Sequence, residues 1–183
     1  MPPRFTSLTA LPGLGAIAAP DTRDRLQEEV SSLFDLYRAP LLRYLSSFGL
    51  AFADGEDVLQ EVFLSLFQHL RSGKSRENLR GWLFRVAHNL ALKRRYRSSR
   101  DLDVVPEVTD PSPNPEEQLA SIQTERRLRA IVKALPEQDR RCLFLRAEGL
   151  RYREIAEVLE MSLGSVAVGV ARSLARIARS AER

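Results

Sequence analysis

Apolar residues recur at intervals of three and four along almost the whole chain after residue 22, and this spacing most limits how the chain can fold. It places apolar side chains along one face of an α-helix, whereas a half-buried strand would show strict alternation. The densest stripe predicts a helix over residues 55–70 and comprises Val58, Leu59, Val62, Phe63, Leu66, Phe67 and Leu70. Because no segment alternates like a strand, we predict an all-α protein.

Prolines, glycines and polar caps divide this pattern into separate helices. Gly49 is expected to end the first helix, and Pro40 either kinks it or starts a second one. Asp54 is a candidate N-cap for the next helix. A later helix is expected to have Pro136 at its first position.

An acidic, proline-rich stretch separates two helical parts. Residues 101–120 carry six acidic and no basic side chains. Such a composition is typical of an extended, self-repelling linker. We therefore expect a flexible tail over 1–22, a helical domain over 23–98, a linker over 99–118 and a second helical domain over 119–183.

The charge is unevenly distributed, although the whole chain has a net charge of only +4. Residues 71–100 carry ten basic side chains and one acidic side chain, whereas residues 1–70 carry five and nine. A basic block of this density favours a polyanionic partner.

Several classes of protein are excluded by what the sequence lacks. Cys142 is the only cysteine, which excludes an intramolecular disulfide, and its apolar neighbours predict a buried thiol. No apolar run approaches the ~18 residues of a membrane span, so we expect a cytoplasmic protein without membrane insertion. No residues resemble a nucleophile with its base or a metal cluster. We therefore expect no enzyme activity and no cofactor.

The last sixty residues predict a helix-turn-helix, with Ser162 capping the second helix from Leu163 to Arg179. We expect its buried stripe to comprise Leu163, Val166, Val170, Leu174 and Ile177. The opposite stripe comprises Ser165, Val168, Arg172, Arg176 and Arg179, and arginines along one line suit phosphate contacts. A solvated arginine face on a helical hairpin remains an alternative.

A second candidate site lies on the helix expected from Leu79 to Arg97. Trp82 is in register with the core, and the polar residues that follow are Arg85, His88, Asn89, Lys93, Arg94, Arg95, Tyr96 and Arg97. Arginine pairs with phosphates, aromatic rings stack on bases and asparagine reads base edges. The alternative is a solvated helix end, where cations favour the helix dipole. The acidic segment Glu56–Glu61 is likewise either a solvated face or a partner-binding face.

Four segments together resemble the extracytoplasmic-function group of bacterial RNA polymerase sigma factors, over residues 28–180. They are Glu56 to Phe63, Leu79 to Ala91, Leu135 to Arg141 and Gly149 to Ala156, in that order. The resemblance implies an alternative sigma factor that binds core RNA polymerase, recognises promoter DNA and promotes strand opening. A stand-alone, dimeric helix-turn-helix regulator is the alternative, and an adaptor without DNA binding is a third interpretation.

The resemblance also implies a role for each matched residue. The clamp helices of the largest polymerase subunit would be bound by Asp57, Gln60 and Glu61. Minus-ten DNA would be faced by Arg85, His88, Asn89, Lys93, Arg94 and Arg95, with a flipped base held in the loop Ser72–Asn78. The second domain would sit on the polymerase flap and bind the minus-thirty-five element through Arg151, Ser162, Ser165, Arg172, Arg176 and Arg179. The linker would run toward the RNA exit channel, and an anti-sigma protein is a further expected partner.

The chain departs from the family pattern at three places. Lys93 replaces the usual acid, and Glu160 stands where the turn often has glycine, so we expect a different turn. The recognition helix carries Ala167-Val168-Gly169 where the family usually has Lys-Ser-Arg. We therefore expect the second domain to position the protein more than to discriminate bases, with Arg172 as the best candidate for a base contact.

Overall fold

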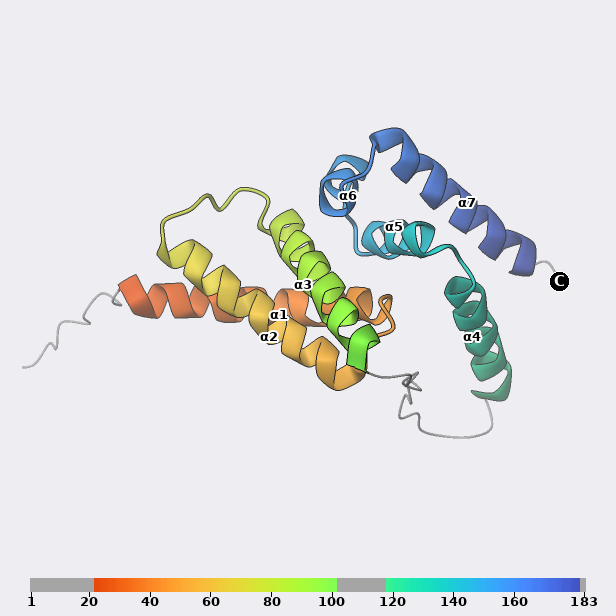
Figure 1. Ribbon diagram of the computed structural model, residues 1–183, viewed down its shortest axis with the longest axis horizontal. Coiled ribbons are helices and arrows are strands. Elements are labelled where there is room, and N and C mark those ends of the chain that lie inside the picture. The colour runs from red at the N-terminus through yellow and green to blue at the C-terminus, as the bar shows by residue number, and fades with distance from the viewer. Residues whose placement is uncertain (1–21, 102–117, 182–183) are drawn as a thin grey trace, which may run out of the picture.

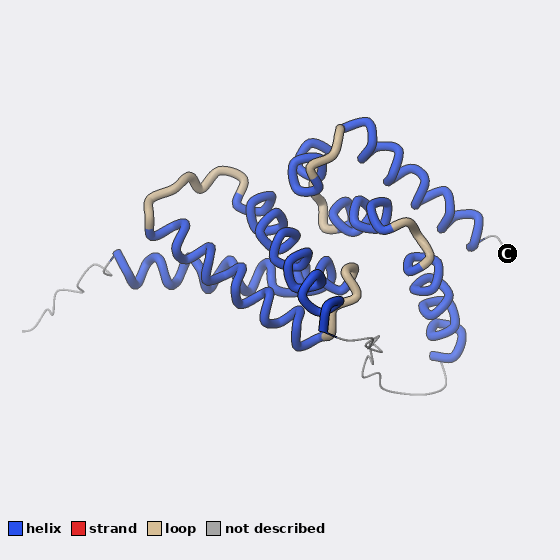
Figure 2. The backbone as a smooth tube through the Cα atoms, in the orientation of Figure 1, coloured by secondary structure: helices blue, strands red, loops and turns tan. Residues whose placement is uncertain are grey.

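Seven helices and no strand form the part of the chain that the structure describes, residues 22–101 and 118–181 (Figure 1). The structure is a computed structural model. The helices are α1 (Thr22–Ser46), α2 (Phe52–Arg71), α3 (Leu79–Asp101), α4 (Gln118–Lys133), α5 (Glu137–Ala147), α6 (Tyr152–Leu159) and α7 (Leu163–Ala181). The all-α class is therefore confirmed, and Figure 2 shows that only short loops join consecutive helices within each half.

The first half consists of α1, α2 and α3, with α2 packed against both of the others. The α2 stripe forms much of this core, since Val58, Leu59, Val62 and Leu66 are at most 2% exposed. The α1 helix continues through Pro40, so a second helix does not start there. It is followed by Gly49, whose φ of +72° favours glycine.

Several boundaries differ from the sequence expectation by a few residues, as is usual at helix ends. Ala51 precedes α2 without a side-chain cap, so the predicted cap at Asp54 is wrong and Asp54 lies in the first turn. Pro136 is the N-cap of α5 rather than its first residue. The α3 helix extends to Asp101, into the region assigned to the linker, and residues 102–117 lie outside the described residues.

The second half consists of α4 to α7, with α7 packed mainly on α5 and α6. The buried face of α7 contains Val166, Gly169, Val170 and Ser173. Leu163 and Leu174 are 48% and 53% exposed, so the stripe expected from the sequence is partly wrong. Small residues take their place in the core because α7 approaches α5 closely at Gly169.

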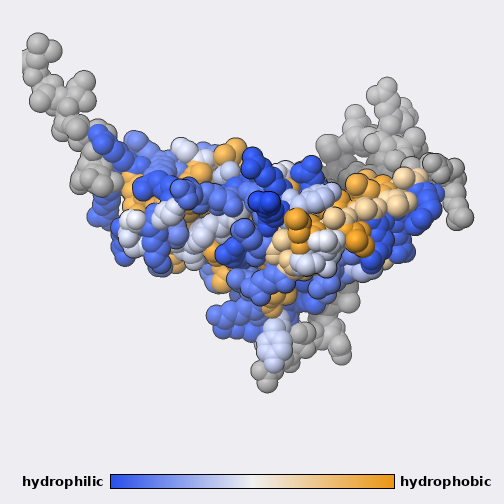
Figure 3. All heavy atoms as spheres, turned by 90° about the horizontal axis from the view of Figure 1, so that it is seen from above, coloured by the Kyte–Doolittle hydropathy of each residue, from blue (hydrophilic) through white to orange (hydrophobic). Residues whose placement is uncertain are grey.

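The two halves also pack against each other, with α3 on α6 and α1 on α5. Their buried apolar residues form one continuous cluster. Hydrophilic residues cover most of the face drawn in Figure 3, and the hydrophobic residues on that face lie in separate groups. No single described helix is long and apolar enough to cross a membrane, although α6 and α7 pass that test when taken together across their 105° bend.

Candidate nucleic-acid and protein interfaces

The acidic face of α2 lies opposite its buried stripe. Asp57, Gln60 and Glu61 are all exposed, as the sequence predicts. The Asp57 carboxylate accepts a 2.9 Å hydrogen bond from Arg94 of α3, which also donates to Asp54 at 2.6 and 3.0 Å. These carboxylates, Asp54 first, raise the pKa of Arg94. Arg94 is therefore tied to α2, while Gln60 and Glu61 point to solvent.

The loop between α2 and α3 is fixed at both ends. His69 Nε2 donates to the Ser75 carbonyl at 2.8 Å, and the His69 ring lies 4.6 Å from that of Trp82. At the other end, Asn78 has a φ of 50° and its Oδ1 accepts from the Gly81 N–H at 3.2 Å, which caps α3. A Cβ on Gly81 would lie 2.6 Å from the Asn78 amide nitrogen, so the cap requires glycine there.

The structure divides the six residues expected to face minus-ten DNA into four groups. Asn89 and Lys93 are exposed on α3. Arg94 belongs to the α2 contact described above. Arg85 pairs with Glu157 of α6 at 3.3 Å, and Arg95 pairs with Glu137 of α5, so both reach across to the second half.

His88 alone is the fourth group, and the expectation that it faces DNA is wrong in this arrangement because the side chain is buried. It is 6% exposed and is hydrogen-bonded through Nδ1 to the buried Tyr44 hydroxyl, with 2.8 Å between the two atoms. Burial, with a smaller effect of the positive Arg141, lowers the pKa of His88 to about 4. The ring is therefore neutral near pH 7, and burial also raises the pKa of Tyr44.

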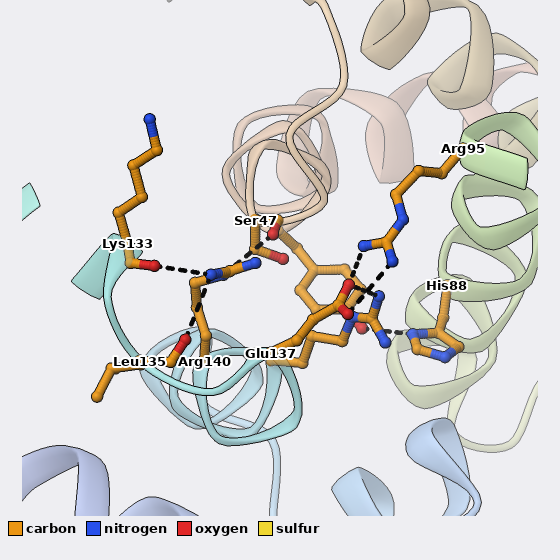
Figure 4. A network of polar contacts seen from close by, with 9 residues as sticks. Ser47, His88, Arg95, Lys133, Leu135, Glu137 and Arg140 are labelled. Carbon is orange, nitrogen blue, oxygen red and sulfur yellow. Dashed lines mark hydrogen bonds and ion pairs between the residues drawn. The ribbon is translucent and has the colours of Figure 1, made fainter. Parts of the chain in front are cut away.

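A polar network joins α5 to the first half at this point (Figure 4). Arg140 donates through Nε to the Ser47 carbonyl at 3.2 Å and through Nη1 to the Lys133 carbonyl at 3.1 Å. These carbonyls lie at the C-terminal ends of α1 and α4, where a helix favours cations. Arg141 is 8% exposed, pairs with Glu137, and its guanidinium lies 4.4 Å from the Phe48 ring centroid.

The helix-turn-helix is present as predicted, formed by α6 and α7. Glu160 joins them with φ 53° and ψ 44°, and its N–H donates to the Ala156 carbonyl. The chain therefore adopts the left-handed turn despite the missing glycine, and the expectation of a different turn is wrong. That conformation costs a residue with a Cβ about 1 kcal/mol.

The outer face of this motif carries the residues expected at minus-thirty-five DNA. Ser162 Oγ accepts from the Ser165 N–H at 3.1 Å, which confirms it as the cap of α7. Arg176 and Arg179 are exposed along one line, and Arg151 is exposed at the start of α6. The side chain of Arg172 is 59% exposed, but it pairs with Asp139 of α5 at 3.2 Å.

Sequence reasoning singled out Arg85 and Arg95, but it missed Arg43, Arg80 and the acidic partners of all four arginines in the second half. The partners are Glu137, Glu148, Glu154 and Glu157. The ion pairs that they form join residues 42 to 105 positions apart, and a local pattern carries no signal for such pairing. The only signal in the sequence was that these residues are acidic, whereas residues 71–100 of the same chain are strongly basic.

The described residues contain no group of three or more His, Cys, Asp or Glu side chains that could hold a metal ion. Cys142 is fully buried, as predicted, and burial raises the pKa of its thiol to about 11. Such a thiol is unreactive near neutral pH.

Comparison with known proteins identifies both halves. Residues 33–101 match the family model described as Sigma-70 region 2, and residues 125–177 match Sigma-70, region 4. RNA polymerase sigma factor SigZ of Bacillus subtilis is 26% identical over 149 residues, covering 81% of this chain and 84% of that protein. ECF RNA polymerase sigma-E factor of Escherichia coli is 29% identical over 155 residues, covering 78% and 75%.

A further relative differs in length. Probable RNA polymerase sigma factor RfaY of Xanthomonas campestris pv. campestris is 32% identical over 133 residues, which is 68% of this chain. The chain matches only 33% of that protein.

Two solved structures share the fold. The sigma factor RpoE from Bartonella quintana, crystallised with the anti-sigma factor NepR, superposes with a TM-score of 0.67 at 17% identity, covering 85% of this chain and 98% of that one. CnrH in complex with the cytosolic domain of CnrY superposes with a TM-score of 0.59 at 23% identity, covering 85% and 89%. At these identities the likeness establishes the fold alone.

Proposed function

The chain belongs to the extracytoplasmic-function group of RNA polymerase sigma factors, and we propose that it binds core RNA polymerase, recognises promoter DNA and promotes strand opening for transcription initiation. One observation carries this proposal: a region 2 module and a region 4 module follow each other in one chain, on its two helical halves. A stand-alone helix-turn-helix regulator would need only the second module. The sigma factor would supply promoter specificity, and the polymerase would form the phosphodiester bonds of the RNA.

The polymerase contact is assigned to the acidic face of α2. This face is a polar surface outside the core of the first half, and it consists of exposed Gln60 and Glu61 with Asp57 beside them. We assign this surface to the clamp helices of the largest polymerase subunit. Acidic side chains on a rigid helix suit a basic-rimmed partner, since charge complementarity speeds association and fixes its register.

The minus-ten contact is assigned to α3 and the loop that precedes it. The helix provides an exposed amide that can read a base edge, that of Asn89. It also provides cations that can bind phosphates, namely Lys93, Arg85 and Arg95. The loop Ser72–Asn78 is the candidate site for a flipped base, because contacts hold it at Ser75 in its middle and at Asn78 at its end.

The minus-thirty-five contact is assigned to α7, while the second half rests on the polymerase flap. Exposed Arg176 and Arg179 lie along the outer face and suit phosphates. Val168, which follows Ser165 on that face, is 54% exposed and offers contact with a thymine methyl but no hydrogen bond. This half therefore positions the factor more than it discriminates bases.

An anti-sigma protein is the further partner that we propose. Both structural neighbours were solved with a partner, the anti-sigma factor NepR in one case and the cytosolic domain of CnrY in the other. An equivalent protein would hold this chain away from polymerase.

Gel filtration with core RNA polymerase tests the proposed function. We expect the chain to move from its own elution volume to that of the polymerase, and the complex to initiate RNA chains that core polymerase alone does not. A chain that stays separate from polymerase and elutes as a dimer on DNA with two half-sites would instead be a stand-alone regulator.

A further inference from the structure

Asp139 is a buried residue of α5 whose two carboxylate oxygens both face α7. The residue is 6% exposed. Its Oδ2 atom accepts a 3.2 Å hydrogen bond from Arg172 Nη1, and its Oδ1 atom lies 3.1 Å from the place of a Cβ on Gly169. Its backbone carbonyl also accepts a hydrogen bond from the Ser173 hydroxyl at 3.3 Å. Asp139 is therefore held against about one turn of α7.

This position suits an ionised carboxylate even though it is buried. A buried charge requires a partner, and the guanidinium of Arg172 provides one. Asp139 also lies in the first turn of α5, where the helix dipole favours negative charge. Because Gly169 has no side chain, α7 leaves room for the carboxylate beside Arg172. The carboxylate is therefore fixed in place, and it fixes the guanidinium that it binds.

The ion pair uses only part of the Arg172 guanidinium. Its Nη1 atom binds Asp139, whereas Nε and Nη2 make no hydrogen bond within the part of the chain that the structure describes. The Arg172 side chain is 59% exposed, and it lies on the outer face of α7 that we assign to minus-thirty-five DNA. The Nε and Nη2 atoms form one edge of the guanidinium, with two parallel donors. Guanine presents two acceptors in the major groove, O6 and N7, and this edge can bind both.

Arg172 differs in this respect from the other arginines of the same face. Arg176 and Arg179 are exposed and form no ion pair with a described residue, so their guanidinium groups keep their rotational freedom. Ordering such a side chain on binding costs free energy, and an arginine that is already held avoids part of this cost. Mobile arginines suit phosphates, whereas recognition of one base requires a guanidinium in a defined place. Of these three arginines, Arg172 meets that requirement.

We infer that Asp139 is a positioning residue: it holds Arg172 on the surface of α7 so that this arginine recognises a guanine in the minus-thirty-five element. The Asp139 side chain is only 9% exposed, so it acts through Arg172 and does not itself contact the DNA. This inference rests on the proposed function of α7. It adds one base-specific contact to a helix that we otherwise assign to phosphates and a thymine methyl.

Selection of DNA by the full chain bound to core RNA polymerase tests this inference. The probe is a library of double-stranded DNA with a randomised upstream segment, and the bound DNA is sequenced. Arg172→Ala removes the proposed base contact. Asp139→Asn keeps the size of the side chain and the backbone contact with Ser173 but removes the charge. Cys142→Ala is the control, because it loosens the same contact between α5 and α7 and leaves the Arg172–Asp139 pair in place.

We expect the parent complex to favour guanine at one position of the minus-thirty-five element by about tenfold or more, since a two-donor contact discriminates strongly between bases. Arg172→Ala should abolish this preference. Asp139→Asn should reduce it about threefold and leave the preferences at other positions unchanged. Cys142→Ala should retain the guanine preference. In an Arg172→Ala background, Asp139→Asn should change the preference no further, because Asp139 acts through Arg172.

A guanine preference that survives Asp139→Asn unchanged would overturn the inference. A uniform loss of preference at all positions would also overturn it, because a residue with only a structural role would cause that loss. A minus-thirty-five preference that does not depend on Arg172 would overturn it and leave the proposed function intact. If the complex selects no sequence at all, the proposed function is rejected and the inference with it.

Asp139→Glu is the second variant, for the case that Asp139→Asn does not fold. It keeps the negative charge, but its longer side chain displaces the Arg172 guanidinium. We expect it to lower the guanine preference as well, whereas an unchanged preference in this variant would contradict the positioning role.

Discussion

Gly169 of α7 lies directly against Asp139 of α5, so that a Cβ added to Gly169 would lie 3.1 Å from the Asp139 Oδ1 atom. The same Cβ would lie 3.5 Å from the Cys142 sulfur. The glycine therefore permits close packing of two helices. Asp139 is 6% exposed and pairs with Arg172, which leaves it little room to move.

Replacing this glycine is therefore expected to destabilise the second half. Gly169→Ala should lower the free energy of unfolding by about 1 kcal/mol, because overpacking at a close contact outweighs the gain in helix propensity. Denaturant unfolding measures this change. Gly164→Ala is the control, since nothing lies within 4 Å of its added Cβ, and it should stabilise by about 0.5 kcal/mol. Equal stabilisation by both variants would show that Gly169 has no packing role.

The turn of the helix-turn-helix stores strain at Glu160, whose φ is 53°. Glu160→Gly should raise the free energy of unfolding by about 1 kcal/mol, because glycine adopts this conformation without a Cβ penalty. Glu160→Ala removes the same charge but keeps the Cβ, and should not stabilise. A thermal melt that gives equal gains for both variants would assign the effect to charge instead.

The polymerase surface of α2 is tested by charge reversal. Asp57→Lys with Glu61→Lys should weaken binding to core polymerase by about tenfold or more, because each replaces an attraction with a repulsion. Exposed substitutions of this kind change stability by about 0.5 kcal/mol or less, so circular dichroism should be unchanged. Asp35→Lys with Glu28→Lys on α1 is the control. Unchanged polymerase affinity in the α2 variant, with the fold intact, would reject the assignment.

The buried His88 predicts a specific loss of stability in acid. Its pKa is about 4 in the folded chain and about 6.5 when unfolded, so the unfolded state binds the extra proton between these values. The stability is fully present above pH 6.5 and falls as the pH drops toward 4. Between pH 7 and 5 the free energy of unfolding should decrease by about 2 kcal/mol.

His88→Gln keeps a polar group beside Tyr44 and removes the titration. Its unfolding free energy should therefore vary less between pH 7 and 5 than that of the parent chain. Parallel pH profiles for the two proteins would show that His88 does not cause the loss.

The longer helices could be predicted from the sequence because their apolar residues recur with helical spacing, as residues 55–70 illustrate. The buried face of α7 could not, because periodicity assigns large apolar residues such as Leu163 and Leu174 to the core. The close approach to α5 instead requires the small residues Gly169 and Ser173. The face of α7 that is buried therefore depends on the distance between α7 and α5, and the periodicity of α7 alone does not reveal this distance.

For the candidate site, the exposed face of α2 could be predicted from the sequence, whereas the contacts of α3 could not. Asp57, Gln60 and Glu61 are exposed as expected, because the face opposite a buried stripe is solvated unless another element covers it. On α3, by contrast, α6 packs against part of the face that was expected to be solvated. The pairing of Arg85 with Glu157 spans 72 positions in the sequence, and only the tertiary fold brings these residues together.

Direction of core polymerase to promoters by this chain is measured most directly by mapping the 5′ ends of RNA made in vitro on sheared bacterial genomic DNA. We expect core polymerase with the chain to produce 5′ ends that core polymerase alone does not, preceded by two shared sequence elements at a constant spacing. Replacing Asn89 by Ala should relax base preference at one position of the nearer element. If the chain adds no new 5′ ends although it is folded and core polymerase is active, the chain is not an initiation factor.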